Sequence, residues 1–136
     1  MDMIVYRVRD AMDRNVIILD EGKTCMDAIK AMMEKKVWSV VVSRNGLPVG
    51  VVTERDIIRR VISKGRDVNR VRLGDIMSTP LVTIGPDEPI GRAMELMVTK
   101  EIRRIYVVEE GRIIGRITQT EAFRHILNVL MTLSQI

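Results

Sequence analysis

The stretch Gly50-Val51-Val52-Thr53-Glu54-Arg55-Asp56 joins the end of an apolar strand to the start of a helix. Two valines precede Thr53, which turns the chain, and Asp56 follows at the third helical position. A second copy, Gly115-Arg116-Ile117-Thr118-Gln119-Thr120-Glu121, lies 65 residues further along the chain. A fixed offset of this kind indicates an internal repeat, which has to be recognised before a fold is assigned.

The offset of 65 residues aligns other parts of the two halves without a gap, including Asp10-Ala11-Met12 with Asp75-Ile76-Met77. We therefore divide the chain into a first repeat with its lead-in (residues 1–65), a polar linker (66–72) and a second repeat with an extended last helix (73–136). A lone unit of about sixty residues is only marginally stable, so we expect the two halves to share a core.

Each repeat is predicted to run β-α-β-β-α, which makes an α+β fold of two units related by a pseudo-twofold axis. Apolar runs, capping residues and turn signals place the elements. The strands are expected at 16–19, 37–43, 49–53, 81–84, 104–108 and 112–118, and the helices at 25–36, 54–64, from 87 and from 119. The lead-in is expected to hold an edge strand at 4–7 and a helical turn at 9–12. In the second helix we expect Ile57, Ile58, Val61 and Ile62 on the inner face.

Composition narrows the class of protein. The chain has 136 residues, a net charge of +4 and one cysteine, Cys25, so an internal disulfide is excluded and the thiol is expected to be buried. The sequence shows neither a signal-peptide pattern nor an apolar run of about 20 residues, and it predicts a cytoplasmic protein without a membrane segment. A lone His125, expected to be an exposed helix residue, argues against metal binding and against a histidine-based catalytic site.

Two tandem units that each end in Gly-x-x-Thr, followed three residues on by an acid, resemble a pair of cystathionine-β-synthase (CBS) domains, the Bateman module. The resemblance covers roughly residues 8–65 and 73–130. It implies clefts between the repeats that bind AMP, ADP, ATP or S-adenosylmethionine as a regulatory ligand. It also implies no catalysis of the chain's own, no required cofactor, control of an effector protein or enzyme, and a homodimer.

The resemblance also assigns residues. It implies that Asp56 holds the ribose hydroxyls and that Thr53 lies near ribose or phosphate, with Arg55 between them as a further candidate contact. Thr118 matches Thr53, but Glu121 replaces the aspartate, so the second repeat departs from the family pattern. The remaining candidates are Arg103 and Arg104, which would face phosphate, and Asn15, Ile17, Thr79 and Leu81, from the segments that would supply backbone to the clefts.

Plainer alternatives remain open. Thr53 with Asp56, and Thr118 with Glu121, also read as capping boxes, worth about 1 kcal/mol of helix stability each. Trp38 suits core or interface packing rather than base stacking. Nucleic-acid binding is a second functional class, although no helix-turn-helix or zinc motif is present. It would use the basic residues Arg55, Arg59, Arg60, Lys64, Arg66, Arg70 and Arg72. A non-catalytic subunit of an enzyme is the third class.

Overall fold

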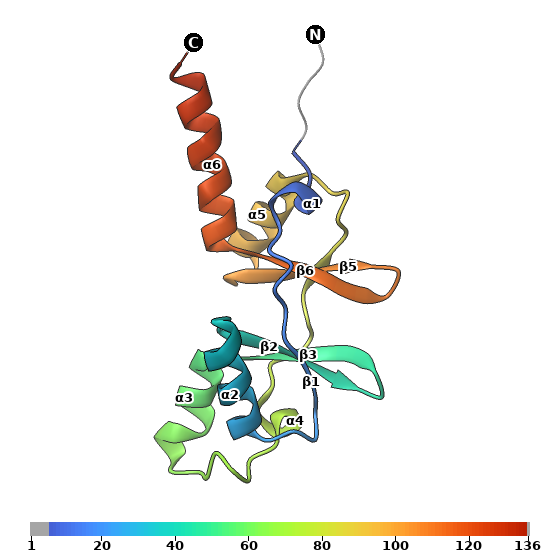
Figure 1. Cartoon of the computed structure of the whole chain (residues 1–136), viewed down its shortest axis with the longest axis vertical. Coiled ribbons are helices and arrows are strands. Elements are labelled where there is room, and N and C mark those ends of the chain that lie inside the picture. The colour runs from blue at the N-terminus through green and yellow to red at the C-terminus, as the bar shows by residue number, and fades with distance from the viewer. Residues whose placement is uncertain (1–5, 136) are drawn as a thin grey trace. The chain divides into compact units, whose positions relative to one another are not determined.

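The computed structural model describes residues 6–135 and divides the chain into two compact units (Figure 1). One unit is Asn15–Leu81, and the other combines the N-terminal lead-in up to Arg14 with Val82 onwards. The first unit contains β1 (Ile18–Asp20), α2 (Cys25–Lys35), β2 (Ser39–Arg44), β3 (Leu47–Thr53), α3 (Glu54–Arg60), the 3₁₀ turn η1 (Ile62–Lys64) and α4 (Leu73–Ile76). The second contains α1 (Val8–Ala11), β4 (Thr83–Ile84), α5 (Ile90–Thr99), β5 (Arg104–Glu109), β6 (Arg112–Thr118) and α6 (Gln119–Leu133).

Each unit holds a three-stranded sheet with its helices on one face (Figure 1). The strand orders are β1-β2-β3 and β4-β5-β6, and in each sheet the first pair is parallel and the second antiparallel. Positive φ angles at Asn45 and Gly46 form the turn of the first hairpin. Glu110 and Gly111 adopt the same conformation in the second hairpin. The predicted β-α-β-β-α order of both repeats is confirmed.

The lead-in segments are exchanged between the sequence repeats. In the first unit the amide of Cys25 donates to the carbonyl of Val71 over 2.8 Å, and Val71 lies at the end of the linker, in the segment (Val71 to Met77) that serves as the lead-in of the second repeat. In the second unit the amide of Ile90 donates to the carbonyl of Tyr6, from the first lead-in, over 2.9 Å. These bonds are equivalent under the 65-residue offset. Each compact unit therefore consists of one repeat and the lead-in of the other.

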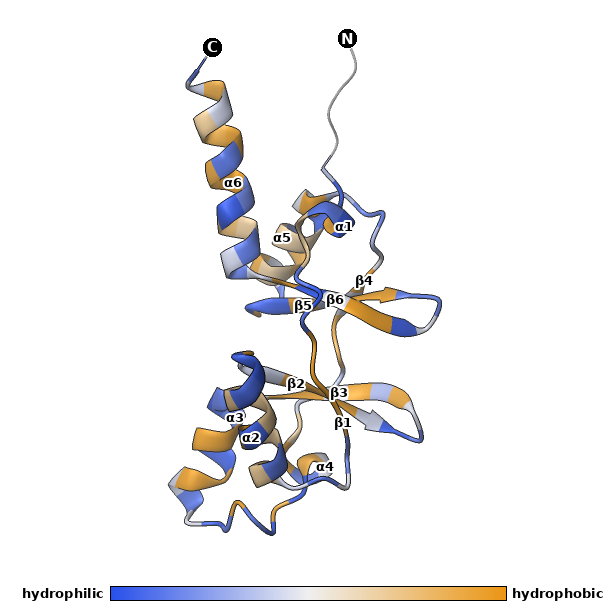
Figure 2. Ribbon diagram, in the orientation of Figure 1, coloured by the Kyte–Doolittle hydropathy of each residue, from blue (hydrophilic) through white to orange (hydrophobic). Residues whose placement is uncertain are grey.

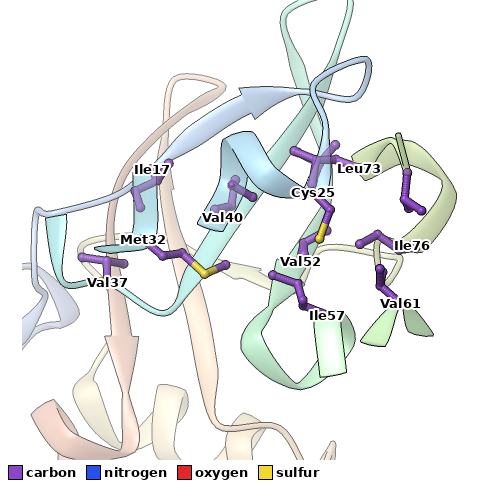
Figure 3. Packing of buried hydrophobic residues seen from close by; sticks show 13 residues of the cluster. Ile17, Cys25, Met32, Val37, Val40, Val52, Ile57, Val61, Leu73 and Ile76 are labelled. Atoms are coloured by element: carbon purple, nitrogen blue, oxygen red, sulfur yellow. The ribbon is translucent and has the colours of Figure 1, made fainter. Parts of the chain in front are cut away.

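This exchange gives each unit a core cluster that draws residues from both halves of the sequence. In the first unit, Cys25 and Met32 of α2 pack with Ile57 of α3 and with Leu73 and Ile76 of α4 (Figure 3). The second cluster takes Val8 from the lead-in in the same way. A unit of about sixty residues gains the missing apolar surface by borrowing this segment. Burial of Cys25 is confirmed, and it raises the pKa of the thiol.

Three local predictions need correction. The helix predicted at 54–64 ends at Arg60, because Val61 adopts a non-helical conformation before η1 begins. Ile58 and Ile62 are 58% and 55% exposed, so their placement on the inner face is wrong, whereas Ile57 and Val61 are buried. Of the edge strand predicted at residues 4–7, residues 4 and 5 lie outside the described part, and Arg7 forms a single β-bridge to Pro89. Within residues 6–135, no helix is long and apolar enough to cross a membrane.

Candidate functional site

The candidate site of the first unit lies at the junction of β3 and α3. The amide of Thr53 donates to Oδ2 of Asp56 over 2.8 Å, and its hydroxyl donates to the same oxygen over 3.1 Å. In return, the amide of Asp56 donates to the Thr53 hydroxyl over 3.3 Å. These bonds form a complete capping box, so the capping prediction for this pair is confirmed.

The second carboxylate oxygen of Asp56 faces other partners. The hydroxyl of Ser78 donates to Oδ1 over 3.2 Å, and the Nε atom of Arg60 lies 4.0 Å from it. The Asp56 side chain is 13% exposed, so it is shielded but accessible. An ionised carboxylate has about four lone-pair positions, and the cap uses only one of its two oxygens. The other oxygen is therefore placed to accept hydroxyl donors.

A close approach of two backbone segments brings Ser78 to this position. Ser78 and Val51 exchange two backbone hydrogen bonds, of 2.8 and 3.0 Å, in an isolated antiparallel bridge. A Cβ atom at Gly50 would lie 2.8 Å from the carbonyl oxygen of Ser78 and 2.9 Å from the sulfur of Met77. Only glycine therefore allows the segment after α4 to reach the strand.

The other sequence-predicted residues of this unit have different surroundings. Thr79 lies near Gly50, because a Cβ atom built on Gly50 would be 3.1 Å from the Thr79 methyl group. The Thr79–Pro80 peptide bond is cis. The side chain of Ile17 is buried in the core, while Asn15 donates to the carbonyl of Lys35 at the end of α2 over 3.2 Å. Both side chains therefore serve the structure. Arg55 is exposed, and Leu81 is half-buried at the end of the unit.

The remaining predicted residues belong to the second unit, at the junction of β6 and α6. The amide and hydroxyl of Thr118 both donate to Oε2 of Glu121, the amide over 2.8 Å, so this capping box is also confirmed. Arg103 is exposed and its carbonyl accepts the amide of Gln119 over 3.1 Å, whereas Arg104 is half-buried.

An open hollow of about 220 Å³ lies beside Glu121, between α1 and the start of α6. Its lining includes His125, which is half-buried and meets the ring of Tyr6 edge-on at a centroid distance of 4.4 Å. The prediction of an exposed histidine is therefore wrong. The full lining is Asp10, Ala11, Glu121, Arg124, His125 and Asn128. Among the described residues, no group of three His, Cys, Asp or Glu side chains is arranged to hold a metal ion.

The residue pattern alone did not identify Ser78, Asp13 or Arg116 as parts of the site. The 65-residue offset places Asp13 on Ser78 and Arg116 on Val51, and the same pair of backbone bonds joins Asp13 to Arg116. In the second unit, the Nη2 atom of Arg116 also lies 3.0 Å from Oδ2 of Asp13. The offset was visible in the sequence, but its significance depends on the bridge that brings the two segments together.

Comparisons with known proteins agree with this architecture. The chain matches the CBS domain family twice, at residues 8–63 and 73–128. It is 35% identical over 116 residues to an uncharacterised protein of Methanopyrus kandleri, and this match covers 84% of the chain but 59% of that relative. The chain thus spans less than two thirds of this relative's length.

Solved structures show the same fold. A conserved protein from Pyrococcus horikoshii superimposes with a TM-score of 0.80 at 31% identity, over 92% of this chain and 94% of that one. A hexameric CBS-CP12 protein from bloom-forming cyanobacteria superimposes with a TM-score of 0.82 at 29% identity, over 89% of this chain and 68% of that one.

Proposed function

The chain belongs to the CBS domain family, and we propose that it senses an adenine nucleotide, AMP, ADP or ATP, at the β3–α3 junction. Pairs of CBS domains are generally regulatory, ligand-binding modules. In this proposal the chain performs no chemistry of its own and requires no cofactor. It responds to the nucleotide and passes the response to an effector protein, an enzyme subunit or a second copy of itself.

The observation that supports the proposal is that the two carboxylate oxygens of Asp56 have different hydrogen-bond partners. One oxygen holds the helix cap, and the other already accepts the hydroxyl of Ser78 over 3.2 Å. A ribose presents two adjacent hydroxyls, which are donors of the same kind. Arg55 lies exposed in the first turn of α3 and offers a positive charge to phosphate. A carboxylate for the sugar and a guanidinium for phosphate together suit a nucleotide.

A thermal-shift panel with AMP, ADP, ATP, GTP and S-adenosylmethionine tests the ligand class, because a ligand that binds only the folded state raises the melting temperature. We expect adenine nucleotides to stabilise the protein more than GTP does. Titration calorimetry with adenosine and AMP then tests the phosphate contact, and AMP should bind more tightly. If no adenine compound raises the melting temperature, the proposal is contradicted. If only S-adenosylmethionine raises it, the ligand is S-adenosylmethionine and not an adenine nucleotide.

The partner surface follows from apolar side chains that the two repeats expose at matching positions. Figure 2 shows hydrophobic residues along α3 and along the full length of α6. An exposed apolar surface repeated in this way is typical of a protein–protein interface. The pairs, each 65 residues apart, are Met33 and Val98, Ile58 and Phe123, and Ile62 and Leu127.

We assign these apolar helix faces, one in each unit, to a symmetric homodimer. Light scattering should give twice the chain mass, and a value near 15.5 kDa would contradict the dimer. Ile58→Glu together with Phe123→Glu should dissociate the dimer. Leu47→Glu is the matched control, because Leu47 is 65% exposed at the start of β3 and belongs to neither helix.

The basic stretch does not favour nucleic-acid binding, because two of its members, Arg60 and Arg72, bind distant segments of the first unit and a third forms a local ion pair. Arg60 donates to the carbonyl of Ile76 over 2.8 Å, Arg72 donates to the carbonyl of Gly22, and Arg70 pairs with Asp67. Oligonucleotide binding with a steep salt dependence would nevertheless support that class instead of the nucleotide sensor.

A further inference from the structure

The two strand–helix junctions differ at two positions that contact each other. In the first unit the bridge after the glycine joins Val51 to Ser78, an apolar side chain and a hydroxyl. In the second unit the equivalent bridge joins Arg116 to Asp13, two opposite charges. The backbone bonds are the same, between 2.8 and 3.0 Å in both units. The difference therefore lies in the side chains alone.

These side chains differ in the hydrogen bonds that they can offer. The Ser78 hydroxyl donates to Asp56, and a hydroxyl rotates readily to another acceptor when a ligand arrives. At the position of Ser78 the second unit has Asp13, whose carboxylate accepts a hydrogen bond from the Arg116 guanidinium over 3.0 Å. The Arg116 side chain is 13% exposed, so this ion pair is shielded from water on the guanidinium side. The hollow beside Glu121 is lined by residues of α1 and α6 and by neither member of the ion pair, so it is a different space.

We infer that the Asp13–Arg116 ion pair closes the second junction to nucleotides, so that each chain binds one nucleotide, in the Asn15–Leu81 unit. This inference rests on the proposed function. A ligand at the second junction would have to separate a shielded ion pair, which leaves a charge without its partner. The charges of the second junction, two carboxylates and one guanidinium, also leave it more negative than the first, where Asp56 faces Arg60.

The hydrogen bonds that a ribose needs also favour the first junction over the second. In the first junction a ribose hydroxyl replaces one hydroxyl donor, Ser78, on the Asp56 carboxylate, so donors and acceptors remain balanced. In the second junction Val51 is replaced by a guanidinium that is already bound to a carboxylate. A ribose hydroxyl could replace either partner of this ion pair only if the charge-assisted bond between Asp13 and Arg116 were lost.

Titration calorimetry of the full chain with AMP, with ADP and ATP in parallel, tests the stoichiometry. The parent chain should bind one nucleotide, and Asp56→Asn should weaken that binding about ten- to a hundredfold while Glu121→Gln leaves it within about twofold. Two nucleotides per chain, or loss of binding through Glu121→Gln, would overturn the inference and leave the proposed function intact. The absence of binding by the parent chain would overturn the proposed function and, with it, this inference.

Exchange of the side chains between the junctions is the decisive test. Asp13→Ser with Arg116→Val and Glu121→Asp copies the first junction into the second, and it should raise the stoichiometry from one nucleotide to two. Since this variant loses an ion pair and can fail to fold, the reciprocal change is made in parallel. Val51→Arg with Ser78→Asp should weaken binding at least tenfold, a change of about 1.4 kcal/mol, while circular dichroism confirms that the chain is folded. A reciprocal variant that folds and binds AMP as the parent does would overturn the inference.

Discussion

Replacement of Asp56 by asparagine separates the two roles of this side chain. The change keeps the size and one oxygen, so the amide of Thr53 retains its acceptor 2.8 Å away. The negative charge at the start of α3 is lost, which costs about 0.3–1 kcal/mol of stability. The other oxygen becomes an NH₂ group, and the Ser78 hydroxyl, now 3.2 Å from Oδ1, can rotate to accept from it. We therefore expect a total loss of stability of about 1–2 kcal/mol.

The effect on nucleotide affinity should be larger than the effect of the cap alone. A hydrogen bond to a charged group contributes about 1.5–3 kcal/mol, and 1.4 kcal/mol corresponds to one decade in affinity. The loss of one charge-assisted bond to ribose should therefore weaken AMP binding about ten- to a hundredfold. The parent should also prefer AMP to its 2′-deoxy form, and Asp56→Asn should lose that preference. Calorimetry measures both affinities, and urea denaturation measures the stability.

Glu121→Gln is the matched control, because Glu121 forms the same capping box in the second unit. It should cost a similar amount of stability and leave AMP affinity within about twofold, or about 0.4 kcal/mol. If Asp56→Asn also loses stability while it binds AMP and 2′-deoxy-AMP as the parent does, the carboxylate is a helix cap only and the nucleotide site is wrongly placed.

Three further predictions concern the scaffold. Gly50→Ala should lower the free energy of unfolding, measured by urea denaturation, by about 1–3 kcal/mol, because the new Cβ would lie 2.8 Å from the carbonyl of Ser78. Gly91→Ala is the control and should be neutral or stabilising, because nothing lies within 4 Å of a Cβ at that position. Equal effects of the two substitutions would contradict this prediction. Burial raises the pKa of the Cys25 thiol, so folded protein should react slowly with a thiol reagent and lose stability as pH rises above the unfolded value of about 8.5; rapid reaction in the folded state would contradict the burial. The hydrogen bond from the Thr24 amide lowers the pKa of the Asp27 carboxyl. The stability that Asp27 contributes should therefore be present above about pH 4 and lost as the pH falls through the lowered pKa of the folded state. An Asp27 carboxyl that titrates at the ordinary value by NMR would refute the cap.

The parts of the fold that local signals determine could be predicted from the sequence. The 65-residue offset gave the repeat, and capping boxes with Asn45-Gly46 gave the element order. These signals act within a few residues, so they hold wherever the segment packs. Periodicity was less decisive in α3, because it groups the apolar positions without showing which neighbours are covered. Ile58 and Ile62 are therefore exposed, contrary to the prediction.

The candidate site could be predicted only in part, because it joins distant segments. Thr53 and Asp56 were found from their spacing, but Ser78 lies 22 residues from Asp56 and reaches it through a backbone bridge. Nothing local in the sequence specifies that bridge. The exchange of lead-ins was missed for the same reason, since Val71 pairs with Cys25 across 46 residues.

The geometry of α3 suggests how nucleotide binding would reach a partner. This helix has only seven residues, and an isolated helix of that length is not stable in water. Asp56 in its first turn holds the cap, while Ile58, two residues further on, faces outward in the proposed dimer surface. A nucleotide bound at one hundred times its Kd would add about 2.7 kcal/mol to the folded state. Part of that free energy would act on the helix that carries Ile58, whereas the 15-residue α6 would remain outside its direct influence.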